Sequence, residues 1–167
     1  MQSNFFPKIL ALALSFVWAM SSHGQDTPAQ ASPDFNAVAD KALAVMKARA
    51  QELHINGVAV VAYSKGDPVM EWSSKMVAVG SITSTGTTNS AAENRLAIAY
   101  TKMAEMASTL KDSGSHSRPK LRGENGWEGG VVARSRTGVV FAAFSGGVSS
   151  DDIKVSRAGL AVLSDSL

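Results

Sequence analysis

Apolar residues recur along the chain with two alternating periods. Steps of three and four residues, typical of amphipathic helices, occupy three segments, at 32–53, 91–111 and 149–163. Short apolar runs, typical of strands, come in two pairs: 58–63 with 69–72, and 131–134 with 139–144. Glycine with other turn-forming residues fills the short gap inside each pair, so each pair predicts an antiparallel hairpin.

The order helix, hairpin, helix, hairpin, helix predicts an α+β domain. We expect one antiparallel sheet built from the two hairpins, with three helices packed on it in the order α-β-β-α-β-β-α. A parallel, doubly wound sheet is disfavoured, because parallel strands need long crossovers and these strands follow one another through short turns. We assign residues 32–167 to this single domain.

Local signals predict where the helices begin and end. Ser32 is the expected N-cap of the first helix, followed by Pro33 at its first position. Asn and Gly at 56–57 favour the left-handed backbone conformation that ends a helix. The sequence SSDD at 149–152 resembles a capping box at the start of the third helix.

The N-terminal segment has the features of a secretory signal peptide, which we assign to residues 1–24. Lys8 provides the positive charge, and an apolar run follows over residues 9–20. A membrane span takes about 20 apolar residues, so we expect cleavage after the segment 22–24 and no stable membrane insertion afterwards. An uncleaved N-terminal anchor is the alternative. Residues 25–31 are then expected to form a flexible lead-in of a periplasmic or secreted protein.

Composition and charge exclude several classes of function. Hydrophobic residues make up 45% of the 167, which excludes wholesale disorder. The chain has no cysteine, so it has no disulfide, thiolate metal site, cysteine nucleophile or covalently attached c-type haem. A formal charge of +2 is too small to indicate a nucleic-acid partner. No nucleophile elbow, dinucleotide-binding, P-loop or paired-histidine zinc motif is present, so those classes lose their main support.

Two histidines are the candidate ligands for a haem iron or another metal. His54 lies near the end of the first predicted helix, where interaction of an imidazolium with the helix dipole is the alternative role. His116 lies in a glycine-rich loop at 112–130, where a solvated side chain is the alternative. Arg118, in the same loop, could meet haem propionates or another anion.

Trp72, Met76 and Trp127 are the candidate apolar contacts of a ligand. Met76 lies close to Trp72 at the first hairpin, where both side chains could contact a ligand. The segment SGG at 145–147, between a strand and a helix, resembles an anion cradle. Because the aspartates at 151–152 already occupy the positive end of the helix dipole, we interpret this segment as a tight turn.

Several segments resemble the GlcG/HbpS-like family, which also occurs as the C-terminal domain of PduO. The likeness covers nearly all of residues 34–164 and is carried by GVAVVAY at 57–63, GGVV at 129–132, FSGG at 144–147, SSDD at 149–152 and RAGLA at 157–161. The chain departs from the family where GENGWEGG at 123–130 replaces the usual loop with glycine and proline. Haem ligation varies among the relatives, so the resemblance assigns no axial ligand.

The resemblance implies a small α+β domain that assembles into homo-oligomers and, in several members, binds haem. Two functions follow as expectations. The first is an exported protein that binds or sequesters haem or another tetrapyrrole. The second is an enzyme, or an accessory of one, that acts on a small organic acid or aromatic compound with the polar loop 80–90, Glu124 and Glu128. Because no acid–base or nucleophile constellation is recognisable, binding is the favoured expectation.

Overall fold

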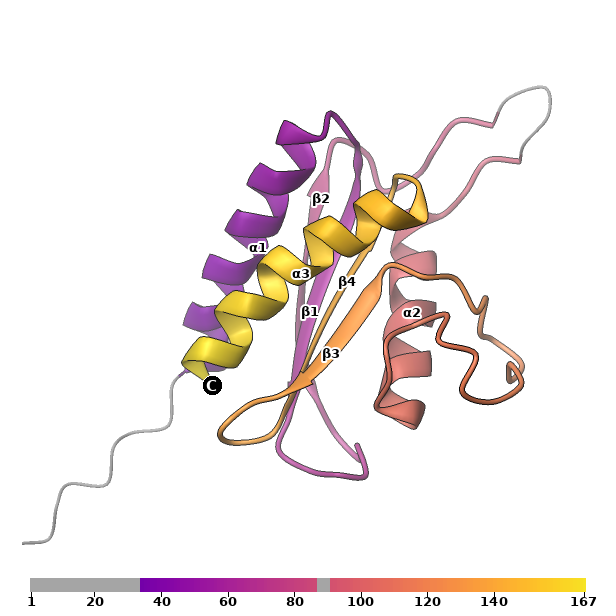
Figure 1. The fold of residues 1–167 in the computed structure, drawn as a ribbon. Helices are drawn as coiled ribbons and strands as arrows, with labels where there is room; N and C mark the ends of the chain where they lie inside the picture. Colours follow the sequence, from indigo (N-terminus) through magenta and orange to yellow (C-terminus); the bar gives the residue numbers. More distant parts are fainter. Residues whose placement is uncertain (1–33, 87–90) are drawn as a thin grey trace, which may run out of the picture. The chain divides into compact units, whose positions relative to one another are not determined.

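The computed structural model describes residues 34–86 and 91–167. These residues form an α+β fold whose elements follow the predicted order (Figure 1). The elements are α1 (Phe35–Glu52), β1 (Gly57–Ser64), β2 (Ser73–Val79), α2 (Arg95–Thr109), β3 (Gly130–Arg134), β4 (Val139–Ser145) and α3 (Ser149–Ser166).

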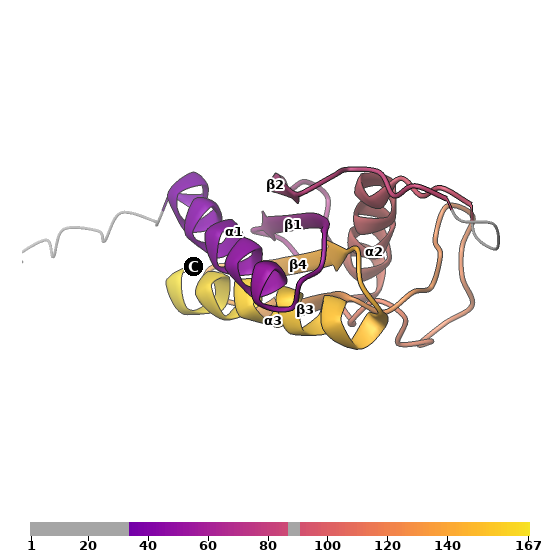
Figure 2. The same ribbon diagram turned by 90° about the horizontal axis from the view of Figure 1, so that it is seen from above.

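The strands of the described residues form one antiparallel sheet in the order β2-β1-β4-β3. The two hairpins meet through β1 and β4, the inner strands. Helices α1 and α3 cover one face of the sheet, and α2 covers the other (Figure 2). The predicted antiparallel sheet with three helices packed on it is therefore confirmed.

The inner strands are buried on both faces, which explains their continuous apolar sequences. Successive side chains of β4 point to opposite faces, so Phe144 packs with α1 and α3 whereas Phe141 packs with α2. Met46 of α1 is fully buried, and Gly159 of α3 leaves room for it, since a Cβ there would collide with the Met46 sulfur. Burial of a side chain of this size stabilises the fold by about 2 kcal/mol.

The second strand lies later in the chain than the sequence predicted. Residues 69–72 belong to the connection between β1 and β2, and pairing with β1 begins at Ser73, opposite Tyr63. The prediction followed an apolar run, but Val69 and Trp72 of this run pack beside α2 from the connection. Because β2 is an edge strand and mostly half-buried, its sequence lacks the apolar run of an inner strand.

Helices α1 and α2 begin at other residues than predicted. Asp34 is the N-cap of α1, and its carboxylate accepts a hydrogen bond from Asn36 N–H at 3.0 Å. Ser32, the predicted cap, lies outside the described residues. Helix α2 starts later than expected because Asn94 is its cap, accepting from Ala97 N–H at 3.0 Å. In both helices, a short polar side chain just before the first helical residue acts as the N-cap, so the helix begins there and not at the expected residue.

The end of α1 is also set by a different residue. His54 adopts a φ of 55° and donates its N–H to the Gln51 carbonyl at 3.0 Å. The N–H of Ile55 donates to the Ala50 carbonyl at 3.0 Å. These two bonds form a Schellman motif with His54 in the left-handed conformation, so the prediction that residues 56–57 end the helix is wrong.

Helix α3 lacks the predicted serine cap. Its N-cap is Val148, which makes no side-chain hydrogen bond to the helix. The carboxylate of Asp152 instead accepts from Gly147 N–H at 2.8 Å, so this side chain holds the turn before the helix. The helix continues to Ser166, beyond the predicted end at residue 163.

The predicted signal peptide and lead-in, residues 1–31, lie outside the described residues and stay predictions. Residues 87–90 of the polar loop also lie outside them. Among the helices that the structure describes, none has the length and apolar composition needed to cross a membrane.

Candidate functional site

At one end of the sheet, the end of β4 and the start of α3 lie near α2 (Figure 1). A polar pocket is lined by residues of these segments. Its volume is about 170 Å³. An engineered cavity of about 150 Å³ holds benzene, so this pocket has the size of a small organic molecule. Its polar and aromatic lining residues include Glu93, Lys102, Trp127, Glu128, Ser149 and Asp152.

The floor of the pocket is a buried ion pair between Lys102 of α2 and Asp152 of α3. The Nζ of Lys102 lies 2.8 Å from Oδ2 of Asp152 and also donates to the Phe144 carbonyl at 2.7 Å. The two side chains are only 3% and 5% exposed. Removing two charges from water costs several kcal/mol per ion, so apolar residues in their place would serve the fold as well. The position of the pair beneath an open pocket favours a role toward a ligand.

Both members of the pair keep hydrogen-bonding capacity in reserve. The Lys102 ammonium has three N–H groups, and two of them are bonded within the described residues. The Asp152 carboxylate can accept about four hydrogen bonds. It accepts from Lys102 Nζ at 2.8 Å and from Gly147 N–H at 2.8 Å. The pair therefore has one donor and at least one acceptor position left for a ligand.

The ionisation of Asp152 depends on its partner. Burial raises the pKa of the Asp152 carboxyl above its usual range, while Lys102 and the amides of Gly147 and Gly146 oppose the rise. Loss of Lys102 would leave the effect of burial largely unopposed. Whether the Asp152 carboxyl is ionised thus depends on Lys102 beside it.

Trp127 and Glu128 form a wall beside this pair, and the backbone of Gly129 holds them there. The Gly129 carbonyl accepts from Ser156 Oγ at 2.6 Å. Gly129 has a φ of 119°, and a Cβ at this position would collide with Lys102 Nζ. Glycine therefore lets the chain cross close to Lys102 and places the two preceding side chains at the pocket.

Glu93 adds a second acidic side chain from the residues just before α2. Its N–H donates to Ser84 Oγ at 2.9 Å, and its carbonyl accepts from Ser84 N–H at 3.0 Å. Neither Glu93 nor Glu128 forms an ion pair with another residue of the described ranges. Two exposed glutamates without an ion pair in the described residues thus line the pocket beside the neutral pair on its floor, and the Cγ of Glu128 packs against Gly114.

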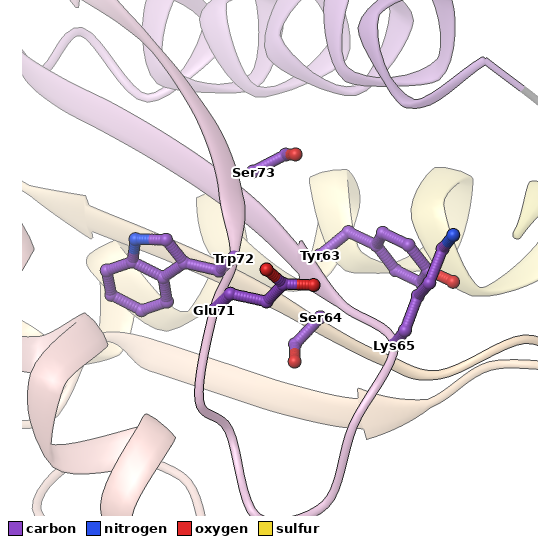
Figure 3. A pocket seen from close by; sticks show the side chains of 6 residues that line it. All are labelled: Tyr63, Ser64, Lys65, Glu71, Trp72 and Ser73. Atoms are coloured by element: carbon purple, nitrogen blue, oxygen red, sulfur yellow. The ribbon is translucent and has the colours of Figure 1, made fainter.

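Two other hollows lie at the opposite end of the inner strands. One, of about 270 Å³, is lined by Tyr63, Lys65, Glu71 and Trp72 (Figure 3). Its indole points away from Tyr63, and its two charged side chains are exposed and opposite in sign. The other, of about 400 Å³, lies between the end of α2 and β3, and its two cationic side chains are exposed. Because no buried charged side chain lines either hollow, the polar pocket is the stronger candidate.

Of the six residues predicted to contact a haem or a metal, Trp127 alone lines the polar pocket. His54 and His116 are exposed, and both adopt left-handed backbone conformations, with φ of 55° and 52°. Histidine is enriched among the non-glycine residues that adopt this conformation. The backbone of His54 thus ends α1, and the backbone of His116 turns the loop after α2.

The remaining three predicted residues are engaged in contacts within the fold. Arg118 binds the Glu124 carboxylate with both terminal guanidinium nitrogens, at 2.8 and 2.7 Å, so this cation is already paired. Trp72 packs edge-to-face on Phe141, with ring centroids 6.3 Å apart. Met76 packs in the same apolar cluster beside α2. The structure thus brings Trp72 and Met76 together in the apolar cluster beside α2.

The six residues do not form one haem pocket within the described part of this chain. His54 precedes β1, whereas Trp72 lies at the far end of that strand, since Ser73 pairs with Tyr63. The eight residues of β1 separate them by about 25 Å. Among the described residues, no three His, Asp or Glu side chains gather as a metal site. A haem ligated by either imidazole would therefore lie on the domain surface.

Sequence reasoning missed Lys102 and Glu93, and it interpreted Asp152 only as part of a helix cap. Lys102 did carry a signal, because it lies between Ala99 and Met103 on the apolar stripe of α2. A lysine at such a position indicates a buried partner. That partner lies 50 residues away, beyond the reach of any local pattern.

Comparison with protein-family models gives no match for this chain, and neither does comparison with curated proteins. The function is therefore inferred from the pocket itself.

Proposed function

We propose that this protein binds a small organic molecule in the polar pocket between α2, β4 and α3. The observation that carries this proposal is the buried Lys102–Asp152 pair at the base of an open pocket. The pair offers one donor and one acceptor to the polar group of a ligand, and Trp127 offers a flat apolar surface to its body. Apolar walls with a few convergent polar groups are typical of small-molecule sites.

Chemical-shift mapping by ¹H–¹⁵N NMR tests this function. Suitable probes are benzylamine, benzyl alcohol and benzoate, three aromatic compounds of the size of the pocket that differ in charge. We expect at least one of them to shift, saturably, the signals of the Gly146 and Gly147 amides and of the Trp127 indole N–H. The indole of Trp72, in the hollow at the other end of the strands, serves as the control. Absence of these shifts at millimolar concentrations of all three probes, or shifts confined to Trp72, would contradict the proposal.

Binding is supported over catalysis by the placement of the acidic residues. Glu128 of the enzyme hypothesis lines the pocket, but Glu124 is held by Arg118 outside it. The two charged side chains on the floor neutralise each other. The described residues thus offer the pocket an indole and polar groups suited to hold a ligand, so ligand binding is the function that we propose.

Haem binding is a separate proposal, drawn from the family resemblance. Titration with hemin, followed at the Soret band, tests it. A saturable shift that is lost in the double variant His54→Ala, His116→Ala would support haem binding by these imidazoles. Either no saturable shift or an unchanged shift in the double variant would overturn it.

Export and assembly into homo-oligomers are likewise proposals. The leader predicts that the exported protein begins at Gln25, which N-terminal sequencing of periplasmic or secreted material tests. Size-exclusion chromatography with light scattering tests the assembly, and a monomer would overturn it.

A further inference from the structure

We infer that the ligand of the polar pocket is a small organic ammonium ion. Because this concerns the ligand class of the same pocket, it rests on the function proposed above. The inference combines the charges around the pocket, the exposed indole at its wall and the reserve acceptor on its floor.

The charges favour a cation over an anion. On the floor, the charge of Lys102 is balanced by Asp152 at 2.8 Å. The carboxylates of Glu93 and Glu128 are not balanced by any ion pair within the described residues. Because both glutamates line the pocket, their negative charges lie within a Debye length of its interior and favour a cation there over an anion.

The N-terminus of α3 does not reverse this preference. A free helix N-terminus attracts anions through its dipole and its unbonded N–H groups. Here Asp152 and Asp151 lie in the first turn, and Asp152 accepts the Gly147 N–H. Asp151 is itself paired with Lys154 at 2.8 Å. The positive end of the helix is therefore already neutralised.

Trp127 supplies the second element of an ammonium site. Its side chain is 48% exposed, and it forms no aromatic pair with another described residue. An indole face that is open beside carboxylates binds organic cations through cation–π attraction. A body of benzene size fits the volume of about 170 Å³.

The floor supplies the third element. The reserve acceptor position of Asp152 suits one N–H of an ammonium group. The third N–H of Lys102 suits an acceptor oxygen, where the ligand carries one. The pocket volume of about 170 Å³ leaves room for an organic body around such an ammonium group.

Separate titrations of the three probes test the ligand class. At neutral pH benzylamine is a cation, benzyl alcohol is neutral and benzoate is an anion, while their aromatic bodies are alike. We expect benzylamine to bind about tenfold more tightly than benzyl alcohol, and benzoate to bind most weakly. Raising the salt concentration should weaken binding of benzylamine and leave that of benzyl alcohol unchanged.

Variants that remove carboxylate charges test which residues cause the preference for a cation. The double variant Glu93→Gln, Glu128→Gln should lower the affinity for benzylamine about tenfold and leave benzyl alcohol unaffected. Both residues are exposed, so the fold should be unchanged. The matched control is Glu71→Gln, an exposed glutamate beside the other described tryptophan, Trp72, and it should alter neither affinity.

The outcomes separate the two proposals. Equal affinities of all three probes, with shifts at Trp127, would overturn the ammonium preference and leave ligand binding in place. Tighter binding of benzoate, or a benzylamine affinity that the double variant does not change, would overturn it as well. Absence of any shift at the pocket would contradict the proposed function itself.

Discussion

The two faces of the sheet share their inner strands but bury different kinds of side chain. On one face, α1 buries apolar residues only, and α3 beside it buries two polar residues, Asp152 and Ser156, near its start, where it meets α2. On the other face, α2 covers the sheet by itself and buries Lys102 and Glu105 among its apolar residues. Two helices cover the first face of the sheet. On the second face, the single helix α2 leaves edges that connecting segments cover. The candidate site lies at such a margin, where polar groups can be buried and still be reached.

Glu105 illustrates how the α2 face uses buried charge for its connections. Its Oε1 accepts the Gly114 N–H at 3.0 Å, which holds the start of the long loop after α2. Its Oε2 is buried and has no hydrogen-bond partner in the described residues. A buried oxygen without a hydrogen-bond partner lowers the free energy of unfolding, whereas the buried apolar residues under α1 and α3 raise it.

The largest expected effect comes from breaking the ion pair of the α2 face. In Asp152→Ala, Lys102 stays buried without its partner, which should cost about 3–5 kcal/mol in the free energy of unfolding. Urea denaturation measures this loss. The control Asp151→Ala removes a neighbouring carboxylate whose ion pair is more exposed, and it should cost less than about 1 kcal/mol. Equal losses in the two variants would contradict the assigned burial.

A cavity in the opposite face should be nearly as costly but should not affect the pocket. Met46→Ala empties a fully buried position under α1 and α3 and should cost about 3 kcal/mol. The volume-conserving Met46→Leu should cost less than about 1.5 kcal/mol. Neither change should alter benzylamine affinity at a concentration where the variant stays folded. Loss of binding in both variants would show that the two faces are not independent.

The two tryptophans of the described residues allow packing and ligand binding to be tested separately. Trp72→Ala removes an indole that packs on Phe141, and it should cost about 2 kcal/mol without changing ligand affinity. Trp127→Ala removes a half-exposed indole, so stability should stay within about 0.5 kcal/mol while benzylamine binding weakens about tenfold. Thermal unfolding and NMR titration measure the two quantities. A loss of stability in Trp127→Ala, together with weaker benzylamine binding in Trp72→Ala, would show that Trp127 packs in the fold and that Trp72 contacts the ligand.

The smallest expected effect concerns the loop that borders the α2 face. Hydrogen bonds from Arg118, and one from Leu121 N–H, lower the pKa of Glu124 from its ordinary 4.5 to about 2. Since the folded pKa is the lower one, the stabilisation is complete above pH 4.5 and disappears as the pH falls toward 2. Amide exchange at Leu121 should therefore lose protection over this range. In Glu124→Gln the protection should be low throughout, and an unchanged acid profile would rule out this carboxylate as the cause.

The difference between the faces also explains which features the sequence could predict. β1 and β4 are buried on both sides, so their continuous apolar runs were recognised with nearly correct bounds. β2 is an edge strand with polar residues such as Lys75, and the prediction placed it too early in the chain. Order and type of elements were thus predictable wherever burial leaves an unbroken pattern.

The candidate site was less predictable because its parts come from separate segments. The sequence marks Trp127 and Glu128 as candidates, but their place beside Lys102 and Asp152 depends on α2 and α3 meeting at the end of β4. The sequence also marks both histidines as candidate ligands, whereas their left-handed backbone conformations assign them to turns. Chemistry-bearing residue types indicate a site only when the fold brings them to one place.

The most direct test of this account replaces the whole pair, with the double variant Lys102→Met, Asp152→Leu. Since no buried charge is left unpaired, stability in urea should stay within about 1.5 kcal/mol of the original protein. The pocket would lose its polar floor, so benzylamine affinity at the Trp127 indole should fall about tenfold. Unfolding of the variant, or a loss above about 3 kcal/mol, would show that the pair serves the fold. Unchanged affinity in a stable variant would show that the pair is not part of a ligand site.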